Sequence, residues 1–498
     1  MSTAFVSDLD TVLLKLNSKD VFTLRDACNG LHCFGSIGSG KTSGLGKAIA
    51  AAYLRAGMGG VVCIAKPEEL TAWKMHAKNN GREQDLLVFG DGEGINFLQY
   101  EFARAGADGA NRVTDTLMKI LEASDRAAGQ EAGKKGEEFW VKTSRQLLLY
   151  AVTALYGATG TVRMNDLIKF IDSAPVMKPI TPEQKKAFEE NNYTVATLSK
   201  MQKRPVCEVA QDLREQSINY FLHQYPNLSP DTRSSVVLSV TATLNRFNSG
   251  MLRKAFCDKT TIVPEMSFGG KIILLNFPVL TTLEEGIVAQ QLFSFLWMRA
   301  IEGRNALPKQ FSERPVFYYA DESQFFIQPY LDTFLSTCRG SKACAVMLTQ
   351  SLPTYYAQLG KDKEAVVDGF VGKFNTKVFF LNSCPKTNKY ASELVGKGIK
   401  IRKQHTQNIT RAMNTNRGGS AAQTSQGWTR SDTNQEGNTT QEHETYLLPS
   451  NYFATQLRNG SPKNKFEVTG ILFKAGAQFL EPMPETSSNV LLATFTQK

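Results

Sequence analysis

A glycine-rich segment between residues 35 and 42 constrains this chain more than any other feature of its sequence. The segment reads GSIGSGKT and matches the pattern GxxxxGK[ST] in full. It follows a short apolar run, Leu31 to Phe34, and precedes an alanine-rich stretch, Ser43 to Arg55, which predicts a strand, a loop and a helix. Loops of this kind turn consecutive backbone N–H groups toward phosphate at a helix N-terminus. The sequence therefore predicts a site for a nucleoside triphosphate, ATP being the expected one, within an α/β fold.

Each residue of this loop is expected to contact the nucleotide. Lys41 would reach the β and γ phosphates, and the hydroxyl of Thr42 would ligate Mg²⁺. The alternative is a chance glycine-rich turn, which the flanking strand and helix disfavour. The predicted nucleotide-binding residues are Gly35, Ser36, Ile37, Gly38, Ser39, Gly40, Lys41 and Thr42.

A second acidic motif follows an apolar run from Val316 to Ala320. Asp321 and Glu322 come directly after this run, at the end of a predicted strand. We expect Asp321 to hold the Mg²⁺ shell through water and Glu322 to polarise the attacking water, a role that hydrolytic ATPases need and nucleotide kinases do not. A solvated acidic strand end is the alternative, and the intact phosphate loop disfavours it. Together the two motifs predict ATP hydrolysis.

Two further residues are candidates for the site. Gln350 follows the apolar run Ala343 to Leu348, and it would lie beside the acidic pair if the two strands are neighbours. There it would sense the γ-phosphate or orient the water. Arg339, in STCRGSK, either reaches the nucleotide of a neighbouring subunit or belongs to the solvated surface, and the sequence leaves both interpretations open.

The pattern of strands and helices predicts an α/β fold with a central, mostly parallel sheet. Strand-like runs occur before residue 110 and again after residue 255, whereas long amphipathic segments fill the region between them. We therefore expect one nucleotide-binding domain interrupted by an inserted all-α domain. The expected divisions are 1–110 and 255–401 for the two parts of the nucleotide-binding domain, 111–254 for the all-α domain, 402–445 for a polar flexible segment, and 446–498 for a last strand and tail that complete the nucleotide-binding domain.

The composition narrows the class of partner and the compartment. Lys and Arg outnumber Asp and Glu by 57 to 47, a net charge of +10 that favours anionic partners such as nucleic acid. The eight cysteines include no CxxC pair, so a reducing cytoplasm is expected. No stretch approaches the roughly 18 to 20 apolar residues of a membrane span. The segment between 402 and 445 is rich in Asn, Gln, Thr and Ser, a composition typical of a flexible loop.

The order of these motifs resembles the motor portion of the conjugative type IV secretion coupling proteins, the TraG/TraD-like branch of the FtsK/HerA ATPases. The resemblance spans nearly the whole chain. It is carried by GSIGSGKT, GGVVCIAKPEEL, EEFWVKTSRQLLLYAV, GGKIILLNFP, PVFYYADESQFF and LSTCRGSKACAVMLTQSLPTYYAQLG. The phosphate loop alone is shared by many NTPases, whereas the acidic strand, the Arg and the Gln around a helical insertion are more selective.

The resemblance implies a RecA-like fold, a hexameric ring and ATP-driven DNA translocation through its channel. It also implies that Lys41 and Thr42 bind nucleotide, that Asp321 and Glu322 form the metal and water site, that Gln350 is a sensor, and that Arg339 acts in trans. A relaxase or secretion-channel proteins would be partners, and the all-α domain would recognise the DNA-processing machinery.

One feature departs from the family, whose members usually begin with membrane-spanning helices. The residues before Leu31 are unsuited to span a membrane, so we expect a cytoplasmic protein. A soluble member of the family and a protein that a partner recruits to the inner face of the membrane both stay open. Four alternatives stay open: a HerA-like DNA motor, a motor that packages a phage genome, a motor for protein substrates, and a nucleotide-gated scaffold with little turnover.

Overall fold

A nine-stranded sheet forms the centre of the computed structural model, which describes residues 4–127, 137–176, 181, 183, 191–204, 209–360, 363–415 and 428–497. Seven neighbouring strands, from β9 at one end to β5 at the other, are parallel. At the β9 end, β12 and then β13 extend the sheet, each antiparallel to its neighbour. The spatial order is β13 (Val490–Thr496), β12 (Glu467–Lys474), β9 (Thr376–Phe379), β3 (Leu31–Phe34), β8 (Ala343–Thr349), β7 (Val316–Ala320), β4 (Gly59–Cys63), β6 (Ile272–Leu275) and β5 (Leu86–Phe89).

The parallel strands are short apolar runs because both of their faces are buried. Alternate side chains of β7 point to opposite faces, with Phe317 in one hydrophobic core and Tyr318 in the other. The same alternation separates Val61 from Val62 in β4. The sheet therefore divides the domain into two cores.

Helices cover both faces of the sheet. Leu24, Ile49 and Trp73 belong to the core on one face, and Phe293 and Tyr355 belong to the core on the other. The covering helices of the first face are α1 (Leu24–Cys28), α2 (Lys47–Arg55) and α3 (Pro67–Asn79). Those of the second face are α13 (Val279–Glu302), α15 (Pro329–Thr337), α16 (Leu352–Leu359), α17 (Glu364–Gly372) and α18 (Pro385–Val395). This arrangement confirms the predicted α/β fold with a mostly parallel sheet.

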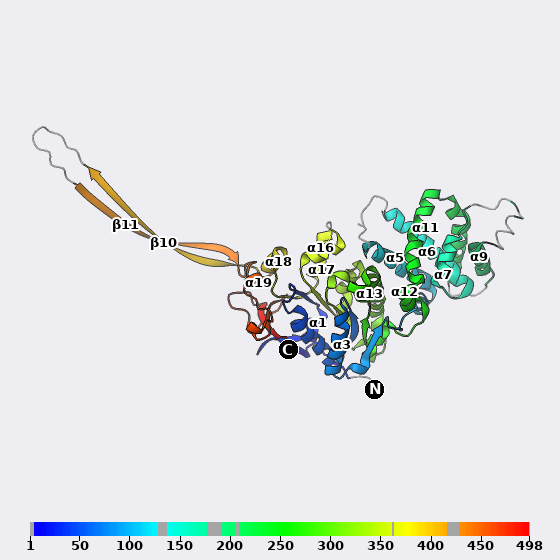
Figure 1. Cartoon of the computed structure of the whole chain (residues 1–498), viewed down its shortest axis with the longest axis horizontal. Coiled ribbons are helices and arrows are strands. Elements are labelled where there is room, and N and C mark those ends of the chain that lie inside the picture. Colours follow the sequence, from blue (N-terminus) through cyan, green and yellow to red (C-terminus); the bar gives the residue numbers. More distant parts are fainter. Residues whose placement is uncertain are drawn as a thin grey trace, which may run out of the picture.

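The described residues between β5 and β6 contain no strand, and their helices form a lobe at one end of the molecule (Figure 1). Its buried residues, such as Leu117 and Leu148, join the same core as α13. Its helices are α4 (Phe97–Ala105), α5 (Gly109–Ala127), α6 (Glu137–Thr159), α7 (Met164–Asp172), α9 (Tyr193–Lys203), α10 (Gln211–Asn219), α11 (Pro230–Asn245) and α12 (Gly250–Arg253). We propose that this lobe, from α5 onward, is the inserted all-α domain expected over residues 111–254.

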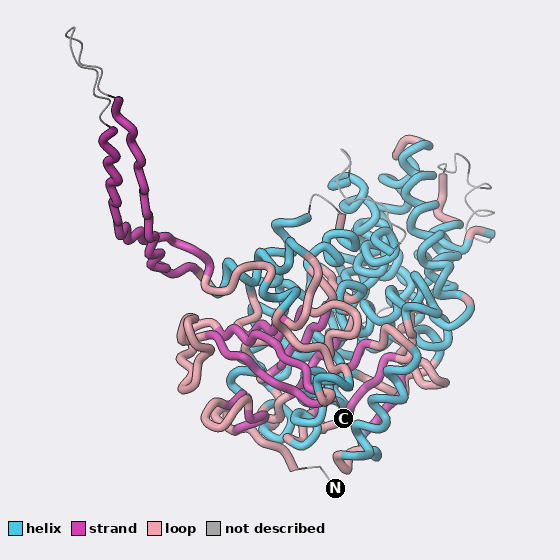
Figure 2. The backbone as a smooth tube through the Cα atoms, turned by 60° about the vertical axis from the view of Figure 1, so that its left-hand side comes forward, coloured by secondary structure: helices cyan, strands magenta, loops and turns pink. Residues whose placement is uncertain are grey.

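A two-stranded antiparallel ribbon extends from the body at the end opposite the helical lobe (Figures 1 and 2). Its strands are β10 (Lys397–Thr415) and β11 (Trp428–Tyr446), paired from Lys397 with Tyr446 to Thr415 with Trp428. The composition predicted a flexible loop here, and the structure differs because a ribbon satisfies backbone hydrogen bonds across the pair without needing a hydrophobic core. Residues 416–427 of the predicted flexible segment lie outside the described residues.

Smaller elements complete the chain. A separate two-stranded sheet of β1 (Val12–Lys15) and β2 (Val21–Thr23) precedes α1, and the short helices α14 (Lys309–Ser312) and α19 (Tyr452–Thr455) lie in connections. In the part of the chain that the structure describes, no helix is both long and apolar enough to cross a membrane.

Candidate nucleotide site

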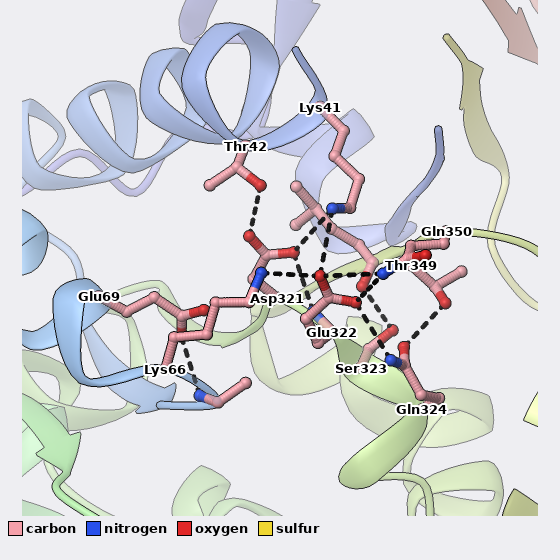
Figure 3. A network of polar contacts seen from close by, with 12 residues as sticks. Lys41, Thr42, Lys66, Glu69, Asp321, Glu322, Ser323, Gln324, Thr349 and Gln350 are labelled. Carbon is pink, nitrogen blue, oxygen red and sulfur yellow. Dashed lines mark hydrogen bonds and ion pairs between the residues drawn. The ribbon is translucent and has the colours of Figure 1, made fainter. Parts of the chain in front are cut away.

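The predicted site residues other than Arg339 gather at the carboxyl ends of β3, β7 and β8 (Figure 3). Strand β8 pairs with β3 on one side and with β7 on the other. Because parallel strands end at the same edge of a sheet, the residues that follow them meet there. The phosphate loop, Gln350 and the pair Asp321 and Glu322 thus come from three adjacent strands, and the expectation that Gln350 lies beside the acidic pair is confirmed.

The phosphate loop has a backbone that depends on glycine. Gly38 and Gly40 adopt φ values of 74° and 88°, a region that favours glycine. A Cβ on Gly40 would also approach Val468 of β12 to 2.3 Å. The first turn after the loop, Lys41–Gly46, is a π-helical turn that leads into α2. The C-terminal strands therefore buttress the loop that the sequence predicted.

Two residues of the loop contact the acidic pair directly. The Thr42 hydroxyl donates a hydrogen bond of 2.5 Å to Oδ2 of Asp321. The Nζ atom of Lys41 lies 3.8 Å from Oδ1 of Asp321 and 3.5 Å from Oε1 of Glu322. Lys41, Asp321 and Glu322 are all buried. A hydroxyl and a carboxylate oxygen thus meet at one point, which is the donor chemistry that Mg²⁺ prefers, so the residues fit a magnesium ion.

Glu322 is surrounded by donors. Its Oε1 accepts from Lys66 Nζ at 3.0 Å, and its Oε2 accepts from Gln324 Nε2 at 3.1 Å and from Gln350 Nε2 at 3.3 Å. Burial raises the pKa of Glu322, but Lys41, Gln324 and Lys66 lower it more, to about 2. The carboxylate is therefore ionised at neutral pH and held from several sides.

The backbone of Glu322 lies in the left-handed region, with a φ of 47°. A residue other than glycine is uncommon there, and the conformation costs about 1 kcal/mol or more. It turns the side chain of Glu322 toward Lys41 and Gln350 (Figure 3). Strain at this position is thus compensated by the contacts that hold the carboxylate.

A further carboxyl group, Glu69, lies in the first turn of α3 near Asp321 (Figure 3). Its Oε2 accepts a hydrogen bond of 2.9 Å from the backbone N–H of Ala65, while its Oε1 is buried without a hydrogen-bond partner in the described part of the chain. Burial, and then the charge of Asp321, raises the pKa of Glu69 to about 8. This carboxyl is therefore mostly protonated at neutral pH.

Arg339 lies apart from the other predicted site residues. It sits in a 3₁₀ turn, Cys338–Ser341, directly before β8, whereas Gln350 follows the other end of that strand. A seven-residue strand spans roughly 20 Å, so Arg339 and Gln350 lie at opposite edges of the sheet. Arg339 is exposed and lines a cavity of about 300 Å³ together with Arg25, Cys28 and Lys342.

Sequence reasoning did not assign a role to Lys66, Glu69 or Gln324. Lys66 and Glu69 follow the apolar run that forms β4, so their place at the carboxyl edge was open to prediction. Their contact with the acidic pair required the pairing of β4 with β7, which joins Val61 to Tyr318 across a large sequence separation. Gln324 is two residues beyond Glu322, and only the turn at Ser323–Phe325 brings its amide back to the carboxylate.

Comparisons with known proteins agree with this fold. Residues 315–449 match a family model described as the TraM recognition site of TraD and TraG. No curated protein sequence matches the chain. Among solved structures, the unbound monoclinic form of the bacterial conjugative coupling protein TrwBdeltaN70 aligns with a TM-score of 0.56 at 13% identity, covering 100% of this chain and 90% of that chain.

Nucleotide complexes of the same coupling protein are similar as well. The complex of TrwB with the non-hydrolysable ATP analogue ADPNP gives a TM-score of 0.54 at 13% identity, with coverage of 100% and 91%. The complex with ADP and Mg²⁺ gives 0.55 at 12% identity, with coverage of 100% and 90%. The fold and the motif residues are those of a RecA-like P-loop NTPase. Within that class, the resemblance of this chain to the TraG/TraD-like coupling proteins is confirmed by the family model and by the fold.

Proposed function

We propose that this chain is an ATP-hydrolysing DNA translocase that acts as the coupling ATPase of a conjugative or type IV secretion-like DNA transfer system. One observation carries the enzymatic part: the Glu322 carboxylate lies 3.5 Å from Lys41 Nζ and 3.3 Å from Gln350 Nε2 at one edge of the sheet. This brings a phosphate-binding lysine, an ionised carboxylate and an amide together, as hydrolysis of a phosphoanhydride requires. The DNA-transfer part is supported by the whole-chain likeness to a plasmid coupling protein.

The chemistry assigned to each residue follows from its contacts. Lys41, now shared between Asp321 and Glu322, turns to the β and γ phosphates when ATP enters the loop. Thr42 and Asp321 would hold Mg²⁺, and the ion would supply positive charge beside the phosphates. Glu322 accepts a hydrogen bond from the attacking water and orients it. Its carboxylate polarises the water, and Gln350 Nε2, which lies 3.3 Å from Oε2, holds the carboxylate in place.

Arg339 is proposed to act on the nucleotide of a neighbouring copy in a ring of six. Its exposed guanidinium precedes β8, at the opposite end of that strand from Gln350. A site in the same chain is therefore out of its reach, whereas a ring brings one face of a subunit against the nucleotide site of the next. In this arrangement Arg339 would stabilise charge on the transferring phosphoryl group.

Partner recognition is proposed for two regions. The helical lobe from α5 to α12 projects from the nucleotide-binding domain (Figure 1), and the family resemblance assigns recognition of the DNA-processing machinery to such a lobe. Residues 315–449 match the model named for TraM recognition, and this stretch ends with the projecting ribbon of β10 and β11. A relaxase and secretion-channel proteins are the expected partners.

The decisive test measures ATP hydrolysis by the purified full chain, alone and with single- or double-stranded DNA. We expect turnover that DNA stimulates, none above background for Lys41→Ala, and slow turnover with retained ATP binding for Glu322→Gln. Equal rates of ATP hydrolysis for the full chain and for Lys41→Ala would refute the proposed ATPase activity. Stimulation that falls steeply as salt rises would identify DNA phosphates as the contact, whereas turnover that DNA does not change would favour a protein cargo.

A further inference from the structure

Lys66 provides a second cation for Glu322 from outside the phosphate loop. It is the N-cap residue of α3, shortly after β4, the strand that pairs with β7. Its Nζ lies 3.0 Å from Oε1 of Glu322. The Lys66 side chain is 41% exposed, while that of Glu322 is 5% exposed. The lysine therefore reaches from the solvent-facing edge of the site to a buried carboxylate (Figure 3).

Lys41 and Lys66 approach the same oxygen of Glu322. The Nζ of Lys41 lies 3.5 Å from Oε1, farther than the 3.0 Å of Lys66. Once phosphates occupy the loop, Lys41 is drawn to them. A buried carboxylate that loses its cation is strongly destabilised and changes its position or its charge. Lys66 is the cation that stays with Glu322 at that moment, because its ion pair does not depend on the loop.

The remaining contacts fix the other oxygen of Glu322. Gln324 Nε2 donates to Oε2 at 3.1 Å, and its own Oε1 accepts from Thr349 Oγ1 at 2.9 Å. Gln350 Nε2 donates to Oε2 at 3.3 Å. The Gln350 amide also lies 3.5 Å from Oε1, so amides contact both oxygens of Glu322, whereas the two ammonium groups approach Oε1. With Lys41 engaged by phosphate, rotation of the carboxylate is limited on the Oε1 side by Lys66.

We propose that Lys66 is a positioning residue for ATP hydrolysis, which holds the Glu322 carboxylate in its water-orienting position while Lys41 binds the phosphates. The proposal rests on the hydrolytic function proposed above. It implies that Lys66 acts on the rate of turnover and not on nucleotide affinity. A lysine that instead contacted the γ-phosphate would have the opposite signature, since its loss would weaken binding.

The test compares Lys66→Met and Lys66→Arg with the unchanged chain. For Lys66→Met we expect kcat to fall about ten- to hundred-fold, the usual cost of misplacing a reacting group, while KM and the Kd for a non-hydrolysable ATP analogue change less than about two-fold. Lys66→Arg keeps the charge and restores part of kcat. Lys74 is an exposed lysine on the same helix, so Lys74→Met serves as the matched control. It should leave kcat, KM and the Kd for the analogue unchanged.

A double-mutant cycle completes the test. In single-turnover measurements, adding Lys66→Met to Glu322→Gln should cause little further loss, because the two residues act as one unit. Independent, additive losses would overturn the proposal, as would unchanged kcat or a loss of analogue affinity as large as the loss of kcat. If the unchanged chain turned over no faster than Lys41→Ala, the proposed function itself would fail and this inference with it. If the unchanged chain hydrolyses ATP and Lys66→Met hydrolyses it equally fast, the inference about Lys66 fails and the proposed function stands.

Discussion

The Thr42 hydroxyl donates a 2.5 Å hydrogen bond to Oδ2 of Asp321, although 279 positions separate them in the sequence. Strand β8 lies between the strands that carry them. The contact spans this intervening strand because Thr42, in the turn Lys41–Gly46, and Asp321 both follow strands that end at the same edge of the sheet. Both oxygens then face one point, and a magnesium ion bound there would replace the hydrogen bond between them.

This contact predicts how substitutions at Thr42 affect the need for magnesium. Thr42→Val removes the hydroxyl with little change of shape, so the Mg²⁺ concentration for half-maximal ATP hydrolysis should rise about ten-fold or more, whereas Thr42→Ser should retain the original requirement. A magnesium titration at fixed ATP measures the effect. Thr71→Val, at an exposed position of α3, is the control. An unchanged requirement in Thr42→Val would remove Thr42 from the metal site.

The two glycines with positive φ in the phosphate loop should respond differently to alanine. At Gly40 a Cβ meets Val468 at 2.3 Å in addition to the backbone strain, whereas at Gly38 no atom lies within 4 Å. Gly38→Ala should cost about 1 kcal/mol from backbone strain alone. Gly40→Ala should cost more, about 2 kcal/mol or above, because β12 must move. Thermal unfolding without nucleotide compares them, and equal melting temperatures would show that β12 does not support the loop.

Strands of the sheet were largely open to prediction because each is a short apolar run that is buried on both faces. The runs Leu31–Phe34 and Val316–Ala320 have the same bounds in the sequence and in the structure. Strand β13 was not predicted, since its residues alternate between buried and exposed at the edge of the sheet. The ribbon of β10 and β11 was also missed, because its polar sequence carries no apolar alternation to indicate a strand.

Site residues that belong to a motif of fixed spacing could be predicted from the sequence. Site residues that reach the site only through the order of strands in the sheet could not. The loop at Gly35 to Thr42 and the pair after β7 are motifs, and the structure brings them together. Lys66 carries no motif of its own, and its contact with Glu322 arises only because β4 pairs with β7. Long-range register of this kind depends on how whole elements pack, which a single sequence does not display.

Glu69 predicts a dependence of stability on pH in a range that is convenient to measure. Burial, followed by the charge of Asp321, raises the pKa of Glu69 from 4.5 to about 8. The unfolded chain therefore releases this proton at lower pH than the folded chain does. The contribution of Glu69 is fully present below about pH 4.5 and is lost as the pH rises through about 8, by at most about 1.4 kcal/mol per pH unit.

Replacement by the neutral isostere isolates this effect. Glu69→Gln should be less sensitive to pH than the unchanged chain, so that the difference between their urea midpoints shifts steadily between about pH 5 and pH 8. Glu68→Gln, at an exposed neighbouring position of the same turn, should follow the unchanged chain at every pH. Parallel curves for Glu69→Gln and the unchanged chain would mean that Glu69 is ionised in the folded state.

Arg339 offers a test of the ring that needs no image of it. Because Arg339 precedes β8 and the nucleotide site lies beyond the other end of that strand, an Arg339→Ala subunit keeps an intact site of its own but fails to support its neighbour. Arg339→Ala and Lys41→Ala should each hydrolyse ATP at least about a hundred-fold more slowly than the unchanged chain. Mixed together, they should regain activity, since some interfaces pair an intact site with an intact arginine. Arg55 is an exposed arginine at the end of α2, and the control variant Arg55→Ala should hydrolyse ATP without a second variant. No recovery over a range of mixing ratios, in rings shown by light scattering to contain both variants, would assign Arg339 to the solvated surface or to a role within its own subunit.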